Sequence, residues 1–488
     1  MAGAPDSAIP FFRTADYSGS ENPEQLALMS GLLLYDSGEA EETFLYRCQD
    51  RYVTYNSLCG FRTVLCVADE THRSVYRTLI EDHDRRMRMV RDRTGIPLPH
   101  TPRPWFATVD PTRIEPLALP PGYSLALNQV SPTCARLAGG GLRPMGALAL
   151  KWHDKAHYVW ASQKAEGLPV HAATALLSMD EFAATRTWGQ LCAVWSERTG
   201  RSEPEALYIK SSYDSGGNAA ARVTASTFRS AAQELQTLLN RGSSIAQLHA
   251  DIDIAPSLAS LVFSEEHLHE FLRSQQLRHG TVNLLVQEVI ESPEDGDIQG
   301  LGITCAIRSE DCVNVVAAAG QIYRDRARHH FCGSYLDGQP INARIAREVR
   351  QLCLLLAREG YRGPVNFDAR RNAAGDWVFL YDCNPRLSAV YPALAARQFL
   401  RSLHWDVRNL ANFGYRGEFG RTDLARILTD LDCAELLLKD NRRSGILPLP
   451  NLSRAHGLDL VAVNIPYREL AAFAARCHLA SGIEFQVF

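Results

Sequence analysis

The sequence of 488 residues lacks paired cysteine motifs, although it contains twelve cysteines. None of them forms a CxxC pair, and most stand in apolar surroundings, as Cys66, Cys192, Cys305 and Cys353 do. This distribution argues against a disulfide framework and against a zinc site. We therefore expect reduced thiols in the core of a cytoplasmic protein.

The sequence also lacks long apolar runs and an excess of basic charge. No run approaches the roughly 18 apolar residues that a membrane-spanning helix requires. Residues 1–10 lack the basic start and apolar centre of a secretory signal, so none is expected. The formal net charge of -4 gives no global basic surface for nucleic acid. We expect neither a membrane nor a nucleic acid as a partner.

The overall composition is that of a globular protein, with 46% apolar and 22% charged residues. The length suggests two to four domains. Residues 1–145 alternate apolar and charged segments, and we predict a separate α/β domain without a recognisable site. A Gly-Gly-Gly stretch at 139–141 is interpreted as a turn, because it lacks the Lys-Ser/Thr ending of a phosphate-binding loop.

Regular patterns become clear after residue 150. A Ser-Met-Asp-Glu stretch at 178–181 is a capping box that predicts the start of a helix. Apolar stripes and glycine stops predict further elements of an α/β fold. The helices are expected at 155–166, 227–240, 343–359 and 467–478, and the strands at 206–210, 281–290, 297–307 and 458–465.

The most informative segment is a predicted β-hairpin. Residues 365–368 (Val-Asn-Phe-Asp) and 378–384 (Val-Phe-Leu-Tyr-Asp-Cys-Asn) form its strands, and the polar stretch 371–376 connects them. On one face of the second strand, two apolar residues precede Asp382 and Asn384. A solvated, charged hairpin is the alternative, but a face that begins apolar and ends polar is typical of a buried site at a strand end.

The polar residues of this hairpin suit a magnesium site. Asn366 and Asp368 share one strand face, and Asp382 and Asn384 share another. Mg²⁺ prefers hard oxygen ligands, and it is bound by carboxylates together with substrate phosphates. Arg386 follows two residues later and can clamp a phosphoryl oxygen.

A second candidate site lies at the end of the strand expected at 206–210. Lys210 ends this strand, and a polar loop that contains Ser215, Gly216 and Gly217 follows. A lysine at this place can reach phosphate, and a glycine-rich loop can direct backbone N–H groups at it. Strand-end lysines are common, so this signal alone is weak.

A third candidate is the polar end of the apolar strand 281–290. Gln287 and Glu288 lie near its end, Ile290 closes it, and Glu294 follows. Such groups can receive a nucleotide base and its ribose. The alternative is an edge strand that enters a turn.

Taken in order, these motifs resemble those of the ATP-grasp superfamily over residues 145–400. Lys155 with the Gly-Leu-Pro-Val stretch at 167–170 is similar to that family's first lysine and its turn. Lys210 and its loop are similar to the second lysine and the loop that covers the phosphates. The resemblance implies that ATP is bound by Lys155, Lys210, Ser215, Gly216, Gly217, Gln287, Glu288, Ile290 and Glu294.

The resemblance also assigns roles to the hairpin. It implies that Asp368, Asp382 and Asn384 bind Mg²⁺, as two ions, and that Arg386 and Lys210 are catalytic. The family usually has Glu at the place of Asp382. It often has a basic residue at the place of Asn366. Arg324, Arg326 or Arg328 can replace the phosphate contact of that basic residue.

Members of this superfamily join a carboxylic acid to an amine, through an acylphosphate, and release ADP and phosphate. The layout resembles ATP-grasp peptide ligases of the pheganomycin biosynthesis type, which implies an amino-acid-like acyl donor and an amino-acid or peptide amine. It implies a pre-ATP-grasp domain at 1–145, an ATP-grasp domain at 146–400 and a small α/β extension at 401–488. A homodimer, a small-molecule kinase, a nucleotide-binding module without turnover and an assembly protein stay open as alternatives.

Overall fold

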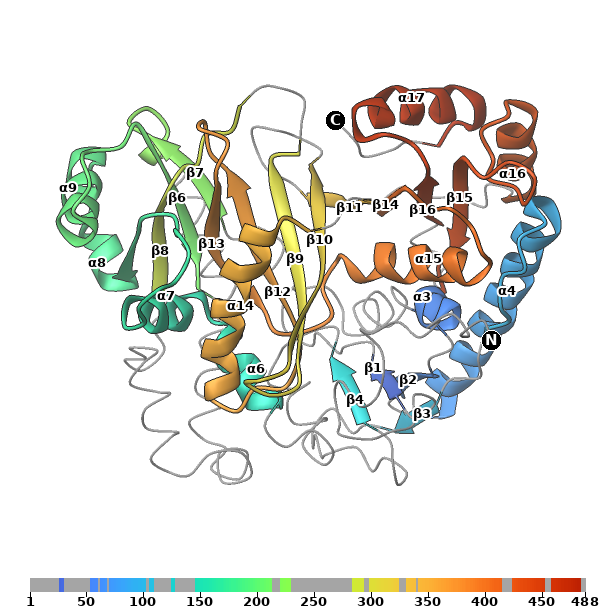
Figure 1. The fold of residues 1–488 in the computed structure, drawn as a ribbon, viewed down its shortest axis with the longest axis horizontal. Coiled ribbons are helices and arrows are strands. Elements are labelled where there is room, and N and C mark those ends of the chain that lie inside the picture. Colours follow the sequence, from blue (N-terminus) through green and yellow to red (C-terminus); the bar gives the residue numbers. More distant parts are fainter. Residues whose placement is uncertain are drawn as a thin grey trace.

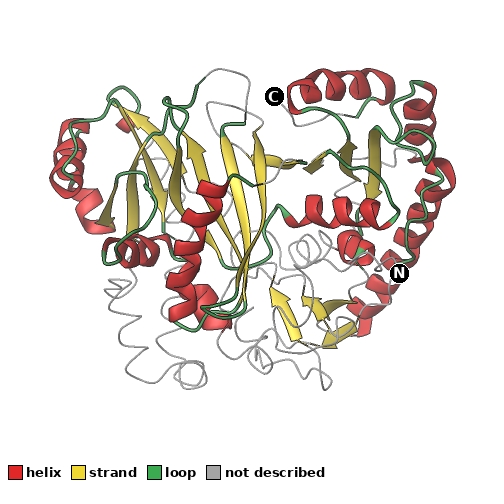
Figure 2. Cartoon of the chain, in the orientation of Figure 1, coloured by secondary structure: helices red, strands yellow, loops and turns green. Residues whose placement is uncertain are grey.

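The computed structural model shows a mixed α/β fold (Figures 1 and 2), which confirms the fold class expected from the sequence. The described residues form one parallel and two antiparallel sheets. No helix among them is long and apolar enough to cross a bilayer. The structure describes residues 26–29, 53–59, 62–67, 70–101, 105–108, 124–127, 145–212, 220–229, 283–293, 298–323, 331–338, 341–414, 424–452 and 458–483.

The N-terminal region contains a four-stranded parallel sheet in the order β3-β2-β1-β4. Its α/β character agrees with the expectation for this part of the chain. The elements are β1 (Leu26–Met29), α3 (Val53–Leu58), β2 (Arg62–Val67), α4 (Glu70–Thr94), β3 (Trp105–Thr108) and β4 (Ser124–Leu127).

The largest sheet has eight antiparallel strands in the order β13-β12-β9-β10-β11-β14-β16-β15. The predicted hairpin is β12 and β13, so its existence is confirmed. The strands are β9 (Gly300–Ile307), β10 (Val313–Tyr323), β11 (Phe331–Asp337), β12 (Gly363–Arg371), β13 (Trp377–Asn384), β14 (Asn409–Gly414), β15 (Gly445–Pro450) and β16 (Leu458–Val463).

Helices cover both faces of this sheet (Figure 1). Ile303 and Cys305 of β9 pack in a core with residues of three helices, whereas Ala306 packs in a second core with the C-terminal helices. Because side chains alternate along a strand, Gly302 and Thr304 lie on the second face with Ala306. The first core includes α6 (Met145–His153), α7 (Lys155–Gln163) and α14 (Ala343–Arg358), and the second includes α15 (Tyr391–Ser402), α16 (Leu424–Cys433) and α17 (Leu470–Ser481).

The third sheet is small and antiparallel, in the order β5-β8-β6-β7. Helices α8 (Met179–Ala184) and α9 (Trp188–Thr199) pack on one face of it. The capping box predicted at Ser178 is present, because Ser178 and Glu181 hydrogen-bond each other's backbone N–H. The strands are β5 (Thr174–Ser178), β6 (Ala206–Ser211), β7 (Ala220–Thr224) and β8 (Asn283–Glu288).

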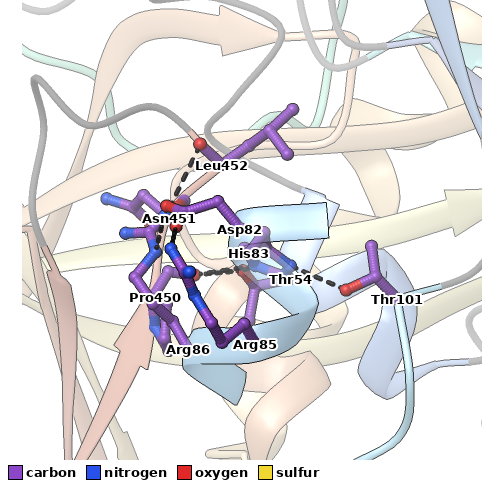
Figure 3. A network of polar contacts seen from close by, with 9 residues as sticks. All are labelled: Thr54, Asp82, His83, Arg85, Arg86, Thr101, Pro450, Asn451 and Leu452. Atoms are coloured by element: carbon purple, nitrogen blue, oxygen red, sulfur yellow. Dashed lines mark hydrogen bonds and ion pairs between the residues drawn. The ribbon is translucent and has the colours of Figure 1, made fainter. Parts of the chain in front are cut away.

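The N-terminal and C-terminal parts of the chain are joined by buried polar contacts (Figure 3). His83 of α4 bonds through Nε2 with Thr54 of α3 at 2.7 Å and through Nδ1 with Thr101 at 2.7 Å. The same Nε2 atom lies 3.0 Å from the carbonyl oxygen of Pro450 in β15. Arg86 donates to the carbonyl oxygen of Asn451 at 2.7 Å. These contacts fix α4 against the far edge of the large sheet.

The predicted elements agree closely with the structure where it describes them. The helix expected at 343–359 is α14, and the strand and helix expected near the C-terminus are β16 and α17. Most of the helix expected at 227–240 and the turn at 139–141 lie outside the described residues. The domain limits stay predictions, and hydrogen bonding within the large sheet continues from β11 to β14 across residue 400.

Candidate functional site

The small sheet meets the large sheet at the edge strand β13. The backbone N–H of Phe379 donates to the carbonyl oxygen of Val170 at 2.9 Å, and the N–H of Ala172 donates to the carbonyl oxygen of Phe379 at 3.0 Å. The segment before β5 is therefore hydrogen-bonded to β13. This contact sets the small sheet beside the polar end of the hairpin (Figure 1).

Two lysines converge on one carboxylate at this junction. Lys210 Nζ donates to Asp382 Oδ2 at 3.1 Å, and Lys155 Nζ lies 3.5 Å from Asp382 Oδ1. Both lysine side chains are largely buried, with exposed fractions of 13% and 7%. Each oxygen of Asp382 therefore has its own cation.

Local structure explains why both lysines point to this place. Leu207 and Ile209 of β6 pack beneath α8 and α9, so Lys210 projects from the opposite face of the strand. Asp154 caps the first turn of α7 by accepting from the N–H of Ala156 at 2.9 Å. Lys155, the first residue of α7, also donates its backbone N–H to Ser212 just beyond β6. The two lysines are thus held side by side.

The charge of Asp382 follows from these partners. Burial raises the pKa of this carboxyl, but the nearby ammonium groups of Lys210 and Lys155 outweigh that effect and lower the pKa to about 2. Asp382 is therefore a carboxylate at neutral pH.

Asp368 lies in a different environment, although it is close enough to Asp382 for the two charges to repel. Burial, followed by the charge of Asp382, raises the pKa of Asp368 to about 7. Its Oδ1 atom accepts from Asn366 Nδ2 at 2.9 Å and from Gln321 Nε2 at 3.0 Å. Its nearest partners are therefore neutral amides.

The hairpin is irregular at this point. Phe367 pairs with Cys383 and Ala369 pairs with Phe379, so Asp368 alone lies opposite residues 380–382. This is a β-bulge, and bulges beside active sites redirect side chains. The extra residues of β13 bring Asp382 to the lysines while Asp368 keeps its place in β12.

Asn384 and Arg386 close the hairpin end. Arg386 Nη2 donates to Asn384 Oδ1 at 3.0 Å, and Arg386 Nη1 donates to the carbonyl oxygen of Leu387 at 3.2 Å. Asn384 is also the register partner of Asn366. The structure therefore gathers the predicted metal ligands with Lys155, Lys210 and Arg386 at one end of the hairpin.

The donor set fits a hard divalent cation. Among the described residues, no group of three or more His, Cys, Asp or Glu is placed to hold a metal ion. The hairpin instead supplies two carboxylates and one amide, in Asp368, Asp382 and Asn384. Such a set leaves coordination positions for phosphate oxygens and water, as Mg²⁺ requires.

The strand β8 holds its predicted site residues inside the small sheet. Gln287 is buried and donates to Thr174 Oγ1 at 3.1 Å. Glu288 Oε1 accepts from the N–H of Ala173 at 2.6 Å. The carbonyl oxygen of Ile290 accepts from Arg370 Nε at 2.9 Å, which fastens the segment after β8 to β12. The nucleotide contacts expected of Gln287, Glu288 and Ile290 stay predictions.

Several predicted residues lie outside the described part of the chain. They follow β6, β8 and β10 in the sequence, and their predicted roles stay predictions. These residues are Ser215, Gly216, Gly217, Glu294, Arg324, Arg326 and Arg328.

Sequence reasoning missed two further residues at the hairpin. Gln321 of β10 donates directly to Asp368. His153 is buried beside Arg386 and Lys155; burial, then these two cations, lower its pKa to about 3, so its imidazole is neutral. The only sequence signal for His153 was its position two residues before Lys155, and Gln321 stood alone in an apolar strand.

No family model and no curated protein matches the sequence. Among solved structures, the chain is similar to the biotin carboxylase domain of Hydrogenobacter thermophilus 2-oxoglutarate carboxylase, with 12% identity, a TM-score of 0.45, and coverage of 94% of this chain and 90% of that chain. It is similar to Staphylococcus aureus N5-carboxyaminoimidazole synthetase complexed with ADP, with 8% identity, a TM-score of 0.46, and coverage of 96% and 100%.

A third similar structure is the L-amino acid ligase from Bacillus licheniformis, with 11% identity, a TM-score of 0.45, and coverage of 95% of this chain and 98% of that chain. At these identities and TM-scores, such similarities by themselves establish neither a shared family nor a function.

Proposed function

We propose that this chain is an ATP-dependent carboxylate–amine ligase of the ATP-grasp type. The observation that carries the proposal is the convergence of Lys155 and Lys210 on the two oxygens of Asp382. These groups come from opposite sides of the junction between the small and large sheets. A site with cations on one side and metal-binding oxygens on the other suits a metal–triphosphate substrate.

The side chains of the site fit the parts of such a substrate. Lys155 and Lys210 would move from Asp382 to phosphate oxygens when a triphosphate binds. Asp368, Asp382 and Asn384 would hold Mg²⁺, and the oxygens of Asp382 that now face the lysines would become available to the metal. When bound, Mg²⁺ would neutralise charge on the phosphates and on the transferred group.

Ligation would proceed in two steps. The substrate carboxylate attacks the γ-phosphorus of ATP, a carboxyl oxygen–phosphorus bond forms, and the bond to ADP breaks. The amine then attacks the acyl carbon, the new C–N bond forms, phosphate leaves, and the amine proton passes to solvent. Lys155, Lys210 and Arg386 would offset the repulsion between a carboxylate and a triphosphate and would stabilise the charge that develops on the transferred group.

The finer assignment concerns the substrates. We propose an amino-acid-like acyl donor and the amine of an amino acid or peptide, in peptide natural-product biosynthesis of the pheganomycin type. Its support is the layout of the chain and the Asp-Cys-Asn-Pro-Arg ending of the hairpin. A kinase that phosphorylates a small molecule, and a nucleotide-binding module without turnover, are the rival functions.

The test is ADP release from Mg²⁺–ATP with pools of amino acids and short peptides, followed by mass spectrometry of the products. ADP together with a product whose mass equals acid plus amine minus water is the expected result. ADP with a phosphorylated product and no condensation would replace the ligase with a kinase. Nucleotide binding without ADP release from any pool would favour the module without turnover.

A further inference from the structure

Asp368 is held by two amides that come from different strands. Asn366 lies two residues before it in β12, and Gln321 lies in β10, on the other side of β9. Both amide nitrogens donate to the same carboxylate oxygen, Oδ1, at 2.9 and 3.0 Å. Within the described part of the chain, the other oxygen of Asp368, Oδ2, accepts no hydrogen bond.

The orientation of both amides is fixed by a second set of hydroxyl groups. Thr304 Oγ1 donates to Asn366 Oδ1 at 3.1 Å, and the Tyr323 hydroxyl donates to Gln321 Oε1. An amide whose oxygen accepts a hydrogen bond presents its NH₂ group on the other side. Each hydroxyl therefore directs an amide NH₂ group at Asp368. Thr304 and Asn366 are both buried, so water does not replace the contact between them.

Glycines in β9 make room for this arrangement. Gly302 is the direct register partner of Asp368. A Cβ atom at Gly300 would lie 2.6 Å from both Gln321 Oε1 and the Tyr323 hydroxyl oxygen, a distance that atoms do not tolerate. Gln321 can therefore lie across β9 toward Asp368 because residue 300 has no side chain.

We infer that Gln321 and Asn366 are positioning residues. Their hydrogen bonds hold Oδ1 of Asp368, so that Oδ2 is the oxygen available to Mg²⁺. This inference rests on the proposed function. Partners of a metal ligand fix its orientation, and their loss typically weakens metal affinity about 10–100-fold. Both amides are neutral, so they orient the carboxylate without adding a charge beside the metal.

The test measures the affinity for Mn²⁺ in the presence of ADP, with binding monitored by electron paramagnetic resonance. Gln321→Leu removes the amide and keeps a similar volume, and we expect Mn²⁺ affinity to fall about tenfold or more. Tyr323→Phe frees the amide to rotate, and we expect a smaller loss in the same direction. The affinity for ADP without metal is expected to stay unchanged in both variants.

Two matched controls separate positioning from general destabilisation. Gln351→Leu makes the same exchange on the exposed side of α14. Tyr361→Phe also removes a buried hydroxyl hydrogen bond, to the carbonyl oxygen of Pro364 at 2.5 Å. If Gln321→Leu binds Mn²⁺ as tightly as Gln351→Leu does, the inference is wrong. If Tyr361→Phe weakens Mn²⁺ binding as much as Tyr323→Phe does, the hydroxyl contact has no specific role.

The wild-type chain separates this inference from the function on which it rests. Mn²⁺ binding by the wild type in the presence of ADP is required by the proposed function. Its absence would overturn the ATP site itself. Binding by the wild type, together with unchanged binding by Gln321→Leu and Tyr323→Phe, would overturn only the positioning role.

Discussion

The two carboxylates of the hairpin provide a comparison within one site. Asp382 is bound by the ammonium groups of Lys155 and Lys210, whereas Asp368 is bound by the amides of Asn366 and Gln321. The pKa of Asp382 falls to about 2 and that of Asp368 rises to about 7. Burial raises the pKa of both carboxyls, and the charge of Asp382 raises that of Asp368 further. Only at Asp382 do the nearby cations, Lys210 and Lys155, reverse the sign of the shift.

The two carboxylates also lie on two sides of the hairpin that have different roles in the site. The charged side of the hairpin faces the small sheet, which supplies cations that suit an anionic substrate. The neutral side lies over β9 and β10, where amides hold a carboxylate in a fixed orientation.

The largest effect is expected from removing the charged carboxylate. Asp382→Ala removes the metal ligand and leaves Lys155 and Lys210 without their shared counter-ion, so ADP formation should fall at least about 10²–10³-fold. The fold should remain, as circular dichroism can check, because about a fifth (22%) of the Asp382 side chain is exposed. The matched control is Asp376→Ala in the exposed hairpin turn. Near-normal turnover by Asp382→Ala would refute its role as a metal ligand.

A smaller loss is expected from removing one cation. Lys210→Ala should weaken ATP binding about 10–100-fold, since hydrogen bonds to charged groups contribute roughly 1.5–3 kcal/mol. Isothermal titration with a non-hydrolysable ATP analogue measures this loss. Lys439→Ala is a suitable control, because Lys439 also pairs with a carboxylate, Asp432, at 2.6 Å. Equal affinities for the two variants would count against Lys210 as a phosphate contact.

The neutral side of the site can be tested through the pH dependence of the free energy of unfolding, measured without metal. The pKa of Asp368 in the folded chain, about 7, lies above its ordinary value of 3.8. The folded chain therefore binds more protons than the unfolded chain between these values, so Asp368 lowers stability as pH rises through this interval. Asp368→Asn should therefore gain stability relative to the wild type as the pH rises from 5 to 8, and urea denaturation in the presence of EDTA measures this gain.

Asp376→Asn serves as the control for this pH dependence, because it makes the same exchange in the exposed turn. Comparing each variant with the wild type cancels the contribution of other titrating groups. Parallel stability curves for Asp368→Asn and the wild type would show that Asp368 is ionised in the folded chain. The contrast between the two carboxylates would then be wrong.

The smallest effect is expected at His83, which extends the comparison to a buried base. Burial, followed by the charge of Arg86, lowers the pKa of His83 from 6.5 to about 4. The unfolded chain then binds the proton first, so this residue lowers stability as pH falls from 6.5 toward 4. His83→Gln should make the acid-induced loss of stability less steep, and His100→Gln, at an exposed histidine, is the control. An unchanged slope would refute the neutral state of His83 (Figure 3).

The sequence predicted the individual helices and strands better than it predicted which strands pair with one another. Strands and helices with clear apolar periods, such as β9 and α14, follow from a short stretch of chain. The junction of β11 with β14 was not predicted, because strand pairing depends on contacts distant in the sequence. For that reason the segment after residue 400 was expected as a separate unit, although its strands continue the large sheet.

The same limit applies to the site. Asp368, Asp382 and Asn384 carry a recognisable spacing, and the structure brings them to one hairpin end with Lys155 and Lys210. Gln321 has no such spacing, since a single glutamine in an apolar strand gives no signal until the strand order is known. The bulge opposite Asp368 was also invisible, because alternation along each strand assumes regular pairing.

The contact of Val170 and Ala172 with Phe379 has a further consequence for the behaviour of the chain in solution. β13 is the last strand of the eight-stranded sheet, and an uncovered edge strand is a template for pairing with another molecule. Both backbone groups of Phe379 are already occupied by the segment before β5. The link that sets two lysines beside Asp382 therefore also occupies part of this edge and opposes its pairing with another molecule.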